Sequence, residues 1–372
     1  MGYRGIDMDY VVVLTHTQIR YDSRIRRQIT MLSKNFNVIL GCQRGSEEGI
    51  DELPSNITYL KFDVNTSYIG SALLKTAFSD DREAQDRMNA FGEAMKIDLR
   101  MLRLYEEYRA DFTYLYKTLY YYVKNNSCKV KAIVVNDVAL LPMGYRLYTA
   151  LLAANPSMKL WGDMHEIHFN YTTDKESFAQ KVRVWAADTY LPRCNYISSV
   201  SEWGAMQYRE RYRSVPTITI RNVARYEELQ PSRITSNLRL VHVGLAGKER
   251  QLEKMIDCML RLDESYTLDF YLVASSEAQE KYIDELKQRT MELGLEERVV
   301  FHEAVHSERL IVELQAYDIG VFYLDPIVQN HVYALPNKLF EYIQARLAVV
   351  TTPLLSMKET IEEYQIGSVS KE

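Results

Sequence analysis

This sequence of 372 residues lacks the features of secreted, membrane-spanning or zinc-binding proteins. Its four cysteines stand far apart, without the paired spacing of a zinc site or a disulfide framework, and fit a reducing compartment. No stretch approaches the ~20 apolar residues needed to span a bilayer. The first residues, MGYRGIDMDY, lack the apolar core of a signal peptide. These absences predict a cytoplasmic protein.

The net charge of −5 leaves no global basic footprint for nucleic acid, so nucleic-acid binding is not expected. Proline is absent from residues 67–127, which are rich in Tyr, Leu, Met, Arg and Lys. This segment reads as helices inserted in a first domain. Basic and aromatic residues alternate in it as they do in membrane-surface helices, and packing against the core is the alternative interpretation.

Outside that segment, short apolar runs alternate with stretches of helical periodicity. The runs before a polar stretch at 225–237 are 11–15, 37–42, 132–136, 159–163, 196–200 and 217–221, and those after it are 238–243, 268–273, 298–301, 319–322 and 348–351. Buried strands joined by crossover helices predict parallel sheets covered on both faces. We therefore expect two doubly wound Rossmann-like domains, 1–225 and 226–372, facing a central cleft. Ligands of such sheets bind at the carboxyl ends of the strands.

The most informative stretch is ALPNKLFEYIQA at 334–345, followed by an apolar run. Pro336 suits the first turn of a helix, whose free N–H groups attract an anion. Lys338 adds a full positive charge to that end, and Glu341 lies one turn later on the same face. A carboxylate there can accept hydrogen bonds from the two hydroxyls of a ribose. The motif predicts a nucleotide-diphosphate site, with a capped helix and a surface ion pair as the alternative.

Several motifs appear together in one order. They are DMHE at 163–166, VSEWGAMQYRERY at 200–212, IRN ending at Asn222, LRLVHVG at 238–244 followed by Arg250, RVVFHEAV at 298–305, and LPNKLFEY. In this order the chain resembles retaining GT-B glycosyltransferases of glycosyltransferase family 4, which build bacterial capsule and O-antigen glycans. The resemblance covers nearly the whole chain, and the second domain matches most specifically.

The resemblance implies transfer of a sugar from a nucleotide-diphosphate donor to a glycan or lipid-linked acceptor, with retention of configuration and without a metal or other cofactor. Arg250 and Lys338 match the family's basic positions and would neutralise the leaving diphosphate. Glu341 matches the ribose-binding glutamate, and Asn337 stands beside Lys338 in the same motif. Gly244 and Gly247 would let the backbone approach a phosphate closely. Lys248 is a further candidate cation.

His165 matches a histidine that the family places beside the donor sugar, where it would bond a hydroxyl or relay a proton. Asp163 and Glu166 are candidates to orient it. Arg24 and Asp22 match a charged pair at the family's first helix, with fold support and acceptor contact as equal interpretations. Asp137 either faces the cleft or caps the following helix.

The sequence departs from the family in three places. Tyr333 stands where many members carry a second glutamate, Arg346-Leu347-Ala348 replaces a Gly-x-Pro turn, and the family usually continues beyond residues 366–367. Two alternatives therefore remain beside the glycosyltransferase: a non-catalytic partner subunit and a GT-B sugar-nucleotide epimerase. The sequence also predicts peripheral contact with the inner membrane face, through the insertion, if the acceptor is lipid-linked. Cationic and aromatic candidates for this contact are Arg100, Arg103, Tyr105, Tyr108, Arg109, Tyr114, Tyr116, Lys117, Tyr120 and Lys124.

Overall fold

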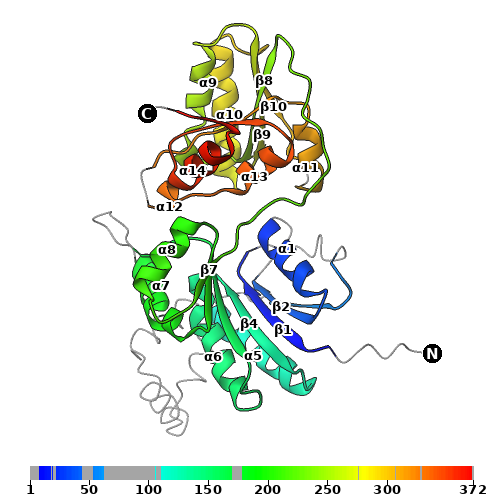
Figure 1. Ribbon diagram of the computed structural model, residues 1–372, viewed down its shortest axis with the longest axis vertical. Coiled ribbons are helices and arrows are strands. Elements are labelled where there is room, and N and C mark those ends of the chain that lie inside the picture. The colour runs from blue at the N-terminus through cyan, green and yellow to red at the C-terminus, as the bar shows by residue number, and fades with distance from the viewer. Residues whose placement is uncertain are drawn as a thin grey trace, which may run out of the picture. The chain divides into compact units, whose positions relative to one another are not determined.

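The computed structural model of the chain describes residues 8–17, 19, 22–43, 53–62, 105, 110–169, 178–274, 276–305, 307–326 and 329–370. The chain divides into two compact units (Figure 1). The first unit comprises Met1–Val200 and Gly204–Ile220, and the second comprises Ser201–Trp203 and Arg221–Glu372. The domain boundary expected at residue 225 rests on the polar composition of the segment that follows it, and it stays a prediction.

The first unit is built on a parallel sheet with the strand order β3-β2-β1-β4-β5-β6-β7. Its strands are β1 (Tyr10–Thr15), β2 (Asn37–Gln43), β3 (Ile57–Phe62), β4 (Val130–Asn136), β5 (Lys159–Met164), β6 (Tyr196–Ser199) and β7 (Thr217–Thr219). Its helices are α1 (Ser23–Leu32), α5 (Ala110–Asn125), α6 (Leu141–Leu152), α7 (Phe178–Tyr190) and α8 (Glu202–Arg211) from Gly204 onward, with short 3-10 turns η1 (Val138–Leu140) and η2 (Leu191–Arg193). The chain order of the strands reverses between β1 and β4, which is where such sheets bind ligands.

Helix α1 shows how the sequence sets this packing. Asp22 begins the helix by accepting a hydrogen bond from the Ile25 N–H at 3.0 Å. Ile25 and Ile29 recur at helical spacing and pack into the cluster formed by alternate residues of β1 and β2. Arg24 and Gln28 occupy the same buried face. Arg24 and Gln28 are therefore buried against the sheet together with the apolar side chains of α1, and they require polar partners there.

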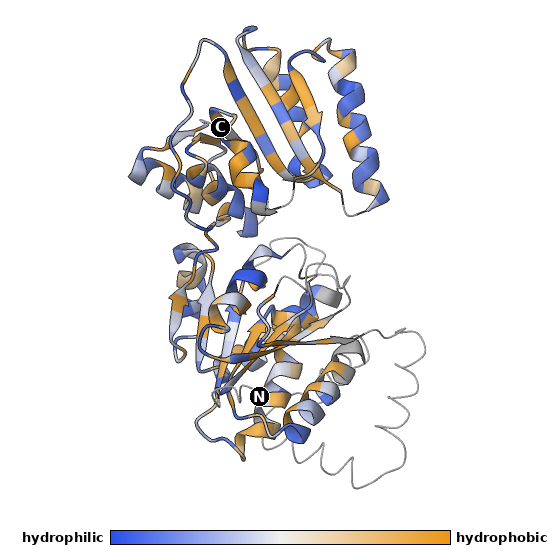
Figure 2. Cartoon of the chain, turned by 90° about the vertical axis from the view of Figure 1, so that its right-hand side faces the viewer, coloured by the Kyte–Doolittle hydropathy of each residue, from blue (hydrophilic) through white to orange (hydrophobic). Residues whose placement is uncertain are grey.

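The second unit is built on a parallel sheet with the order β10-β9-β8-β11-β12-β13, which reverses between β8 and β11. Its strands are β8 (Leu238–Leu245), β9 (Tyr266–Val273), β10 (Val299–His302), β11 (Ile319–Phe322), β12 (Ala348–Thr351) and β13 (Gly367–Val369). Its helical segments are η3 (Lys248–Arg250), α9 (Glu253–Met259), α10 (Glu277–Glu292), α11 (Ser307–Leu314), α12 (Gln329–Val332), α13 (Asn337–Gln344) and α14 (Leu355–Tyr364). Figure 2 shows hydrophobic residues gathered on the strands within each unit.

Both sheets confirm the predicted fold class of two doubly wound, Rossmann-like α/β units. Two strands at the far edges of the sheets were not predicted. Strand β13 has only three residues and includes a glycine, so it carries little apolar signal. Strand β3, with the sequence ITYLKF, mixes polar and apolar residues as an edge strand does.

The predicted helical insertion at 67–127 lies largely outside the described residues, which include Tyr105 and helix α5. Tyr105 is 3% exposed, and its hydroxyl donates to the Ala139 carbonyl oxygen at 2.5 Å. Its proposed contact with a membrane surface is therefore wrong, because the ring is covered by the first unit itself. Within the part of the chain that the structure describes, none of the helices has the length and apolar character of a membrane span.

Candidate functional site

Tyr342 fixes helix α13 to the centre of the second sheet. Its fully buried ring lies against the backbone of β11, so that a Cβ added at Gly320 would come within 2.3 Å of the ring. Its hydroxyl donates to the Val321 carbonyl oxygen at 3.2 Å and accepts from the Val243 N–H at 3.3 Å. These bonds tie α13 to β8 and β11, the two strands between which the order reverses. Lys338, one turn earlier, is thereby held at the expected ligand-binding edge.

The first turn of α13 is suited to an anion. Pro336 is the N-cap residue, and its side chain makes no capping hydrogen bond to the first N–H groups. Asn337 begins the helix, and its side-chain oxygen accepts from the Asn222 amide at 2.6 Å. The N–H groups of this turn and the positive end of the helix dipole can therefore act on a bound phosphate.

Gly244 and Gly247 differ in whether their positions could accommodate a side chain. Gly244, near the end of β8, has φ +140, and an added Cβ would lie 2.2 Å from Cε of Lys338. The Lys338 side chain thus runs directly over the Gly244 backbone, with its Nζ 5.6 Å from the centre of the Phe322 ring. Gly247 has φ −108, which any residue adopts, and the atom nearest to an added Cβ would be a carboxylate oxygen of Glu249 at 1.9 Å, at the end of a flexible side chain that can move away. Gly244 alone is required by the geometry around Lys338.

Lys338 and Arg250 form a basic pair in a poorly solvated place. Burial first, and then the charge of Arg250, lower the pKa of Lys338 to about 8, and the charge of Glu341 opposes both effects. Burial also lowers the pKa of Arg250, and its Nε is buried without a hydrogen-bond partner among the described residues. The Glu249 carboxylate stands 3.9 Å from that nitrogen. Two cations that disfavour each other in this way would both be stabilised by a multiply charged anion.

Sequence reasoning missed His242, which lies fully buried on β8. Its Nδ1 lies 2.9 Å from the Val321 carbonyl oxygen and must donate to it, so that Nε2 keeps the lone pair. Burial first, and then the charge of Lys338, lowers the pKa of His242 to about 3. The imidazole is therefore neutral beside the two cations. An alternating apolar strand pattern gives no signal for such a residue.

Lys248, the other candidate cation of this loop, is engaged elsewhere. Its ammonium lies 2.7 Å from the Glu285 carboxylate on α10, and its side chain is 66% exposed. The basic pair of the site is thus Arg250 and Lys338.

The contrast between the two glycines gives a matched test. In Gly244→Ala, the new methyl group must displace the Lys338 side chain and must adopt a positive φ. We expect nucleoside diphosphate binding to weaken by about 1.5–3 kcal/mol, the contribution of a hydrogen bond to a charged group. Gly247→Ala should bind as the wild type does. Calorimetric titration with a nucleoside diphosphate measures both variants, and equal affinities would remove Gly244 from the site.

In the first unit, His165 follows β5 and is oriented by two residues. Its Nε2 lies 3.3 Å from Oδ1 of Asn136 and 3.5 Å from Oδ2 of Asp163. Asp163 is fully buried and paired with Arg24, whose NH2 group lies 2.5 Å from its Oδ1. Burial alone would raise the pKa of Asp163, yet the hydrogen bond from His165 and the charge of Arg24 bring it well below its ordinary value. The side chain of Glu166 is exposed, and its backbone oxygen accepts from Tyr208.

The remaining charged residues singled out in this unit support the fold. Asp22 caps α1, and Arg24 pairs with Asp163 rather than with Asp22. Asp137 caps η1 by accepting from the Ala139 N–H at 2.7 Å. Among the described residues, no group of three His, Cys, Asp or Glu side chains is placed to hold a metal ion.

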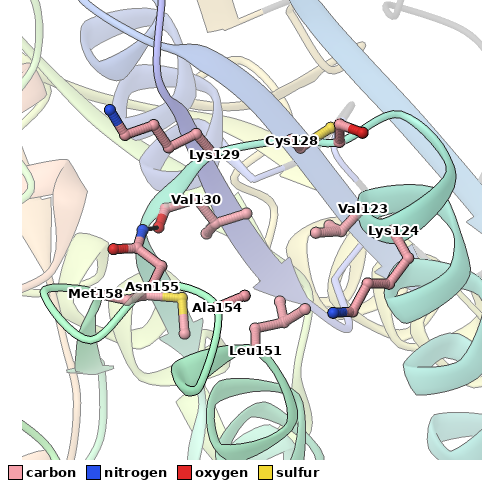
Figure 3. Close-up of a pocket in the computed structure, with 10 residues that line it drawn as sticks. Val123, Lys124, Cys128, Lys129, Val130, Leu151, Ala154, Asn155 and Met158 are labelled. Carbon is pink, nitrogen blue, oxygen red and sulfur yellow. Dashed lines mark hydrogen bonds between the residues drawn. The ribbon is translucent and has the colours of Figure 1, made fainter.

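A cavity of about 310 Å³ lies at the opposite, amino-terminal edge of the first sheet (Figure 3). It is lined by the ends of α5 and α6 and the start of β4, with Lys124 and Lys129 on different sides and the Asn155 amide bonded to the Val130 backbone. The carboxyl ends of two helices meet there, and their dipoles disfavour an anion. Of the residues singled out in the sequence, its lining includes Lys124, a candidate for membrane contact, and none of those predicted to bind the donor or to act in catalysis.

The comparisons with known proteins now bear on this geometry. Residues 237–371, almost all of the second unit, match the family described as glycosyl transferases group 1. Among solved structures, Anabaena HepE in complex with UDP and glucose is similar with a TM-score of 0.64 at 13% identity, over 97% of this chain and 85% of that one. The chain has the GT-B fold.

Two further GT-B structures match to a similar extent. The sucrose-phosphate synthase of Thermosynechococcus elongatus has a TM-score of 0.64 at 13% identity, covering 97% of this chain and 85% of that chain. The E. coli trehalose-6-phosphate structure bound with UDP-2-fluoro glucose has a TM-score of 0.62 at 10% identity, covering 97% and 88%. No curated protein matches the sequence.

Within this GT-B chain, the predicted residues fall into two groups. Gly244, Arg250, Asn337, Lys338 and Glu341 belong to the second unit, where Arg250 and Glu341 both act electrostatically on Lys338. His165 belongs to the first unit, at the carboxyl end of β5. In the second unit the group lies near the end of β8 or after β11, the two strands between which the strand order reverses. In the first unit His165 follows β5, which is next to β4, one of the two strands at the reversal of that sheet.

Proposed function

We propose that this chain is a glycosyltransferase that moves a sugar from a nucleotide-diphosphate donor to a glycan or lipid-linked acceptor, with retention of anomeric configuration. The observation that carries the proposal is the pair of poorly solvated cations formed by Arg250 of η3 and Lys338 in the first turn of α13, with Gly244 beneath Lys338. A bound diphosphate would supply the negative charge that stabilises these two cations. The group 1 glycosyl transferase match over the same residues supports the same reaction class.

The second unit would bind the donor through its nucleotide. Glu341 lies one turn after Lys338 on α13, so its carboxylate can accept from ribose hydroxyls while Lys338 and the helix start hold the phosphates. As the bond to the sugar breaks, negative charge grows on the leaving diphosphate. Arg250 and Lys338 would stabilise that charge more strongly in the transition state than in the bound donor.

The reaction is proposed to need no metal ion or other cofactor. Arg250, Lys338 and the N-terminus of α13 supply the positive charge that a divalent cation would otherwise bring to a diphosphate. Transfer activity should therefore persist when a chelator is added.

The first unit would contribute His165. Its ring is partly exposed and held by buried partners, as suits a group that contacts a sugar hydroxyl. A cytoplasmic enzyme with a lipid-linked acceptor would act at the membrane face, and peripheral attachment through the insertion remains part of the proposal.

One experiment separates this function from its two rivals. UDP-glucose is the first donor to test, because similar structures hold UDP and glucose or a UDP-glucose analogue. Release of UDP would be measured without acceptor, with a soluble glycan, and with a lipid-linked acceptor in vesicles. Release that requires an acceptor supports transfer, and the anomeric signals of the product establish retention. Conversion of the donor sugar without any acceptor would support an epimerase. Binding without turnover of any nucleotide sugar tested would support a non-catalytic subunit.

Glu341 provides a direct test of the nucleotide site. Glu341→Ala should weaken UDP binding by about 1.5–3 kcal/mol, because a charged acceptor of the ribose hydroxyls is lost. The fold should be unaffected, since alanine is well tolerated in a helix. Calorimetry on the folded variant decides the matter, and wild-type affinity would place the ribose elsewhere.

A further inference from the structure

A chain of buried polar groups leads to His165 from beneath the first sheet. Asp163 on β5 is 0% exposed, and its carboxylate accepts from Arg24 on α1, with Nε at 3.0 Å from Oδ2. Ser198 on β6 donates to Oδ1 at 2.5 Å. Gln28, one turn after Arg24, donates through Nε2 to Oδ2 at 2.9 Å. Arg24 also makes a second bond to the carboxylate, from NH2 to Oδ1. Arg24 and Ser198 therefore already pair the carboxylate, and Gln28 adds a fourth hydrogen bond that has to be explained.

The direction of every hydrogen bond in this chain follows from the carboxylate, which can only accept. The Gln28 amide must turn its NH₂ group toward Asp163, and therefore its oxygen toward β4. That oxygen accepts from Nδ2 of Asn136 at 2.9 Å. The Asn136 amide is thereby turned as well, and its own oxygen faces Nε2 of His165 at 3.3 Å. Asn136 is 1% exposed, so water cannot readily replace these partners.

His165 is the end of this chain and its most exposed member, with 28% of its side chain exposed. Both oxygens close to Nε2, those of Asn136 and Asp163, are acceptors, so Nε2 must carry a proton. In the neutral ring the lone pair then stays on Nδ1. A nitrogen with a lone pair accepts from a hydroxyl group, and it has nothing to donate to a phosphate or a carboxylate.

We propose that Gln28 and Asn136 are positioning residues that fix His165 as the Nε2–H tautomer and reserve its Nδ1 to accept a hydrogen bond from a substrate hydroxyl. The identity of that hydroxyl as part of a sugar rests on the proposed function. The tautomer itself is a property of the protein alone.

The tautomer can be measured directly. The chain has seven histidines, so ¹⁵N-labelling of histidine followed by long-range ¹H–¹⁵N correlation spectroscopy gives few signals, and His165→Gln assigns the one that disappears. Spectra of the neutral ring of the wild type should show a protonated Nε2 and an unprotonated Nδ1. A protonated Nδ1 in the wild-type protein overturns the proposal, whether or not any variant folds.

Gln28→Met tests this relay, the series of hydrogen bonds from Asp163 through Gln28 and Asn136 to His165. Methionine fills about the same space as glutamine without an amide group. The Asn136 amide should lose its fixed orientation, and the His165 signals should move toward a mixture of the two tautomers. In a transfer assay, kcat should fall about ten- to a hundredfold, as expected when a substrate-positioning group loses its orientation, while the affinity for UDP in the second unit stays unchanged. Unchanged His165 signals in the folded variant would contradict the relay.

Ser33→Ala is the matched control, because Ser33 is a buried polar residue at the end of the same helix whose hydroxyl contacts only the Thr30 carbonyl among the described side-chain bonds. It should leave both the tautomer and kcat unchanged. Asn136→Ala serves if Gln28→Met does not fold, since it removes the partner of Nε2 directly. If the wild-type protein has the Nε2–H tautomer but transfers no sugar, the positioning of His165 is supported and the proposed function is refuted. If the protein transfers sugar but has the Nδ1–H tautomer, the proposed function is supported and the positioning of His165 is refuted.

Discussion

Arg250→Ala should lower the turnover number of the enzyme about a hundred- to a thousandfold, the loss found when one donor that stabilises a developing charge is removed. The affinity for the intact donor should fall much less, because the charge on the leaving diphosphate grows mainly in the transition state. Single-turnover kinetics together with calorimetric titration of UDP-glucose separate the two quantities.

Lys248→Ala is the control for this variant. Lys248 lies in the same short turn η3, but its ammonium is 2.7 Å from Glu285 and its side chain is largely exposed. It should turn over the donor like the wild type. Equal losses in the two variants would mean that the loop contributes only a diffuse positive field, and wild-type turnover in Arg250→Ala would remove this residue from the site.

The binding of UDP should depend on pH above about pH 8, because burial and Arg250 lower the pKa of Lys338 to about 8 in the free protein. Below that pH the ammonium is already protonated, and the affinity should be flat with respect to this group. Above it, the diphosphate must bind together with a proton, and the affinity should fall about tenfold for each pH unit until the raised pKa of the complex is reached. UDP affinity therefore falls as the pH rises, because the bound diphosphate favours the protonated, positively charged form of Lys338.

Calorimetry in two buffers of different ionisation enthalpy measures the proton taken up. Lys338→Arg is the informative variant, because a guanidinium stays protonated throughout this range, and its UDP affinity should lose the dependence on pH. A wild-type affinity that does not change with pH, with no proton uptake, would show that Lys338 does not face the phosphates.

Residues close together in the sequence made the second unit largely predictable. Pro336, Lys338 and Glu341 lie within two helical turns, so helix geometry alone places them on one end and one face. The apolar runs predicted most of the buried strands, since parallel strands covered on both faces are continuously hydrophobic. The place of Gly244 beneath Lys338, 94 residues later, has no local signal, and only the structure reveals it.

The polar relay of the first unit could not be predicted in the same way. Gln28 and Asn136 come from α1 and β4, 108 residues apart, and nothing near either of them in the sequence indicates the other. Asp163 and Glu166 were the candidates to orient His165, because both lie close to it in sequence, and the contact with Asp163 is present. The prediction for Glu166 is wrong. The side chain of Glu166 is exposed, whereas the strand geometry brings Asn136 and Asp163 together at the carboxyl ends of β4 and β5.

The contacts of Arg24 have a consequence for the order in which the newly made chain can fold. Its guanidinium reaches a carboxylate 139 residues later and the Ile220 carbonyl oxygen 196 residues later, at the last residue of the first unit. Contacts so distant in sequence close late, because the intervening chain must be ordered first. During translation, Arg24 leaves the ribosome long before either partner exists. The polar chain that ends at His165 therefore reaches its final form only after β5 and β7 have joined the sheet, and the emerging N-terminal segment must keep this arginine hydrated until then.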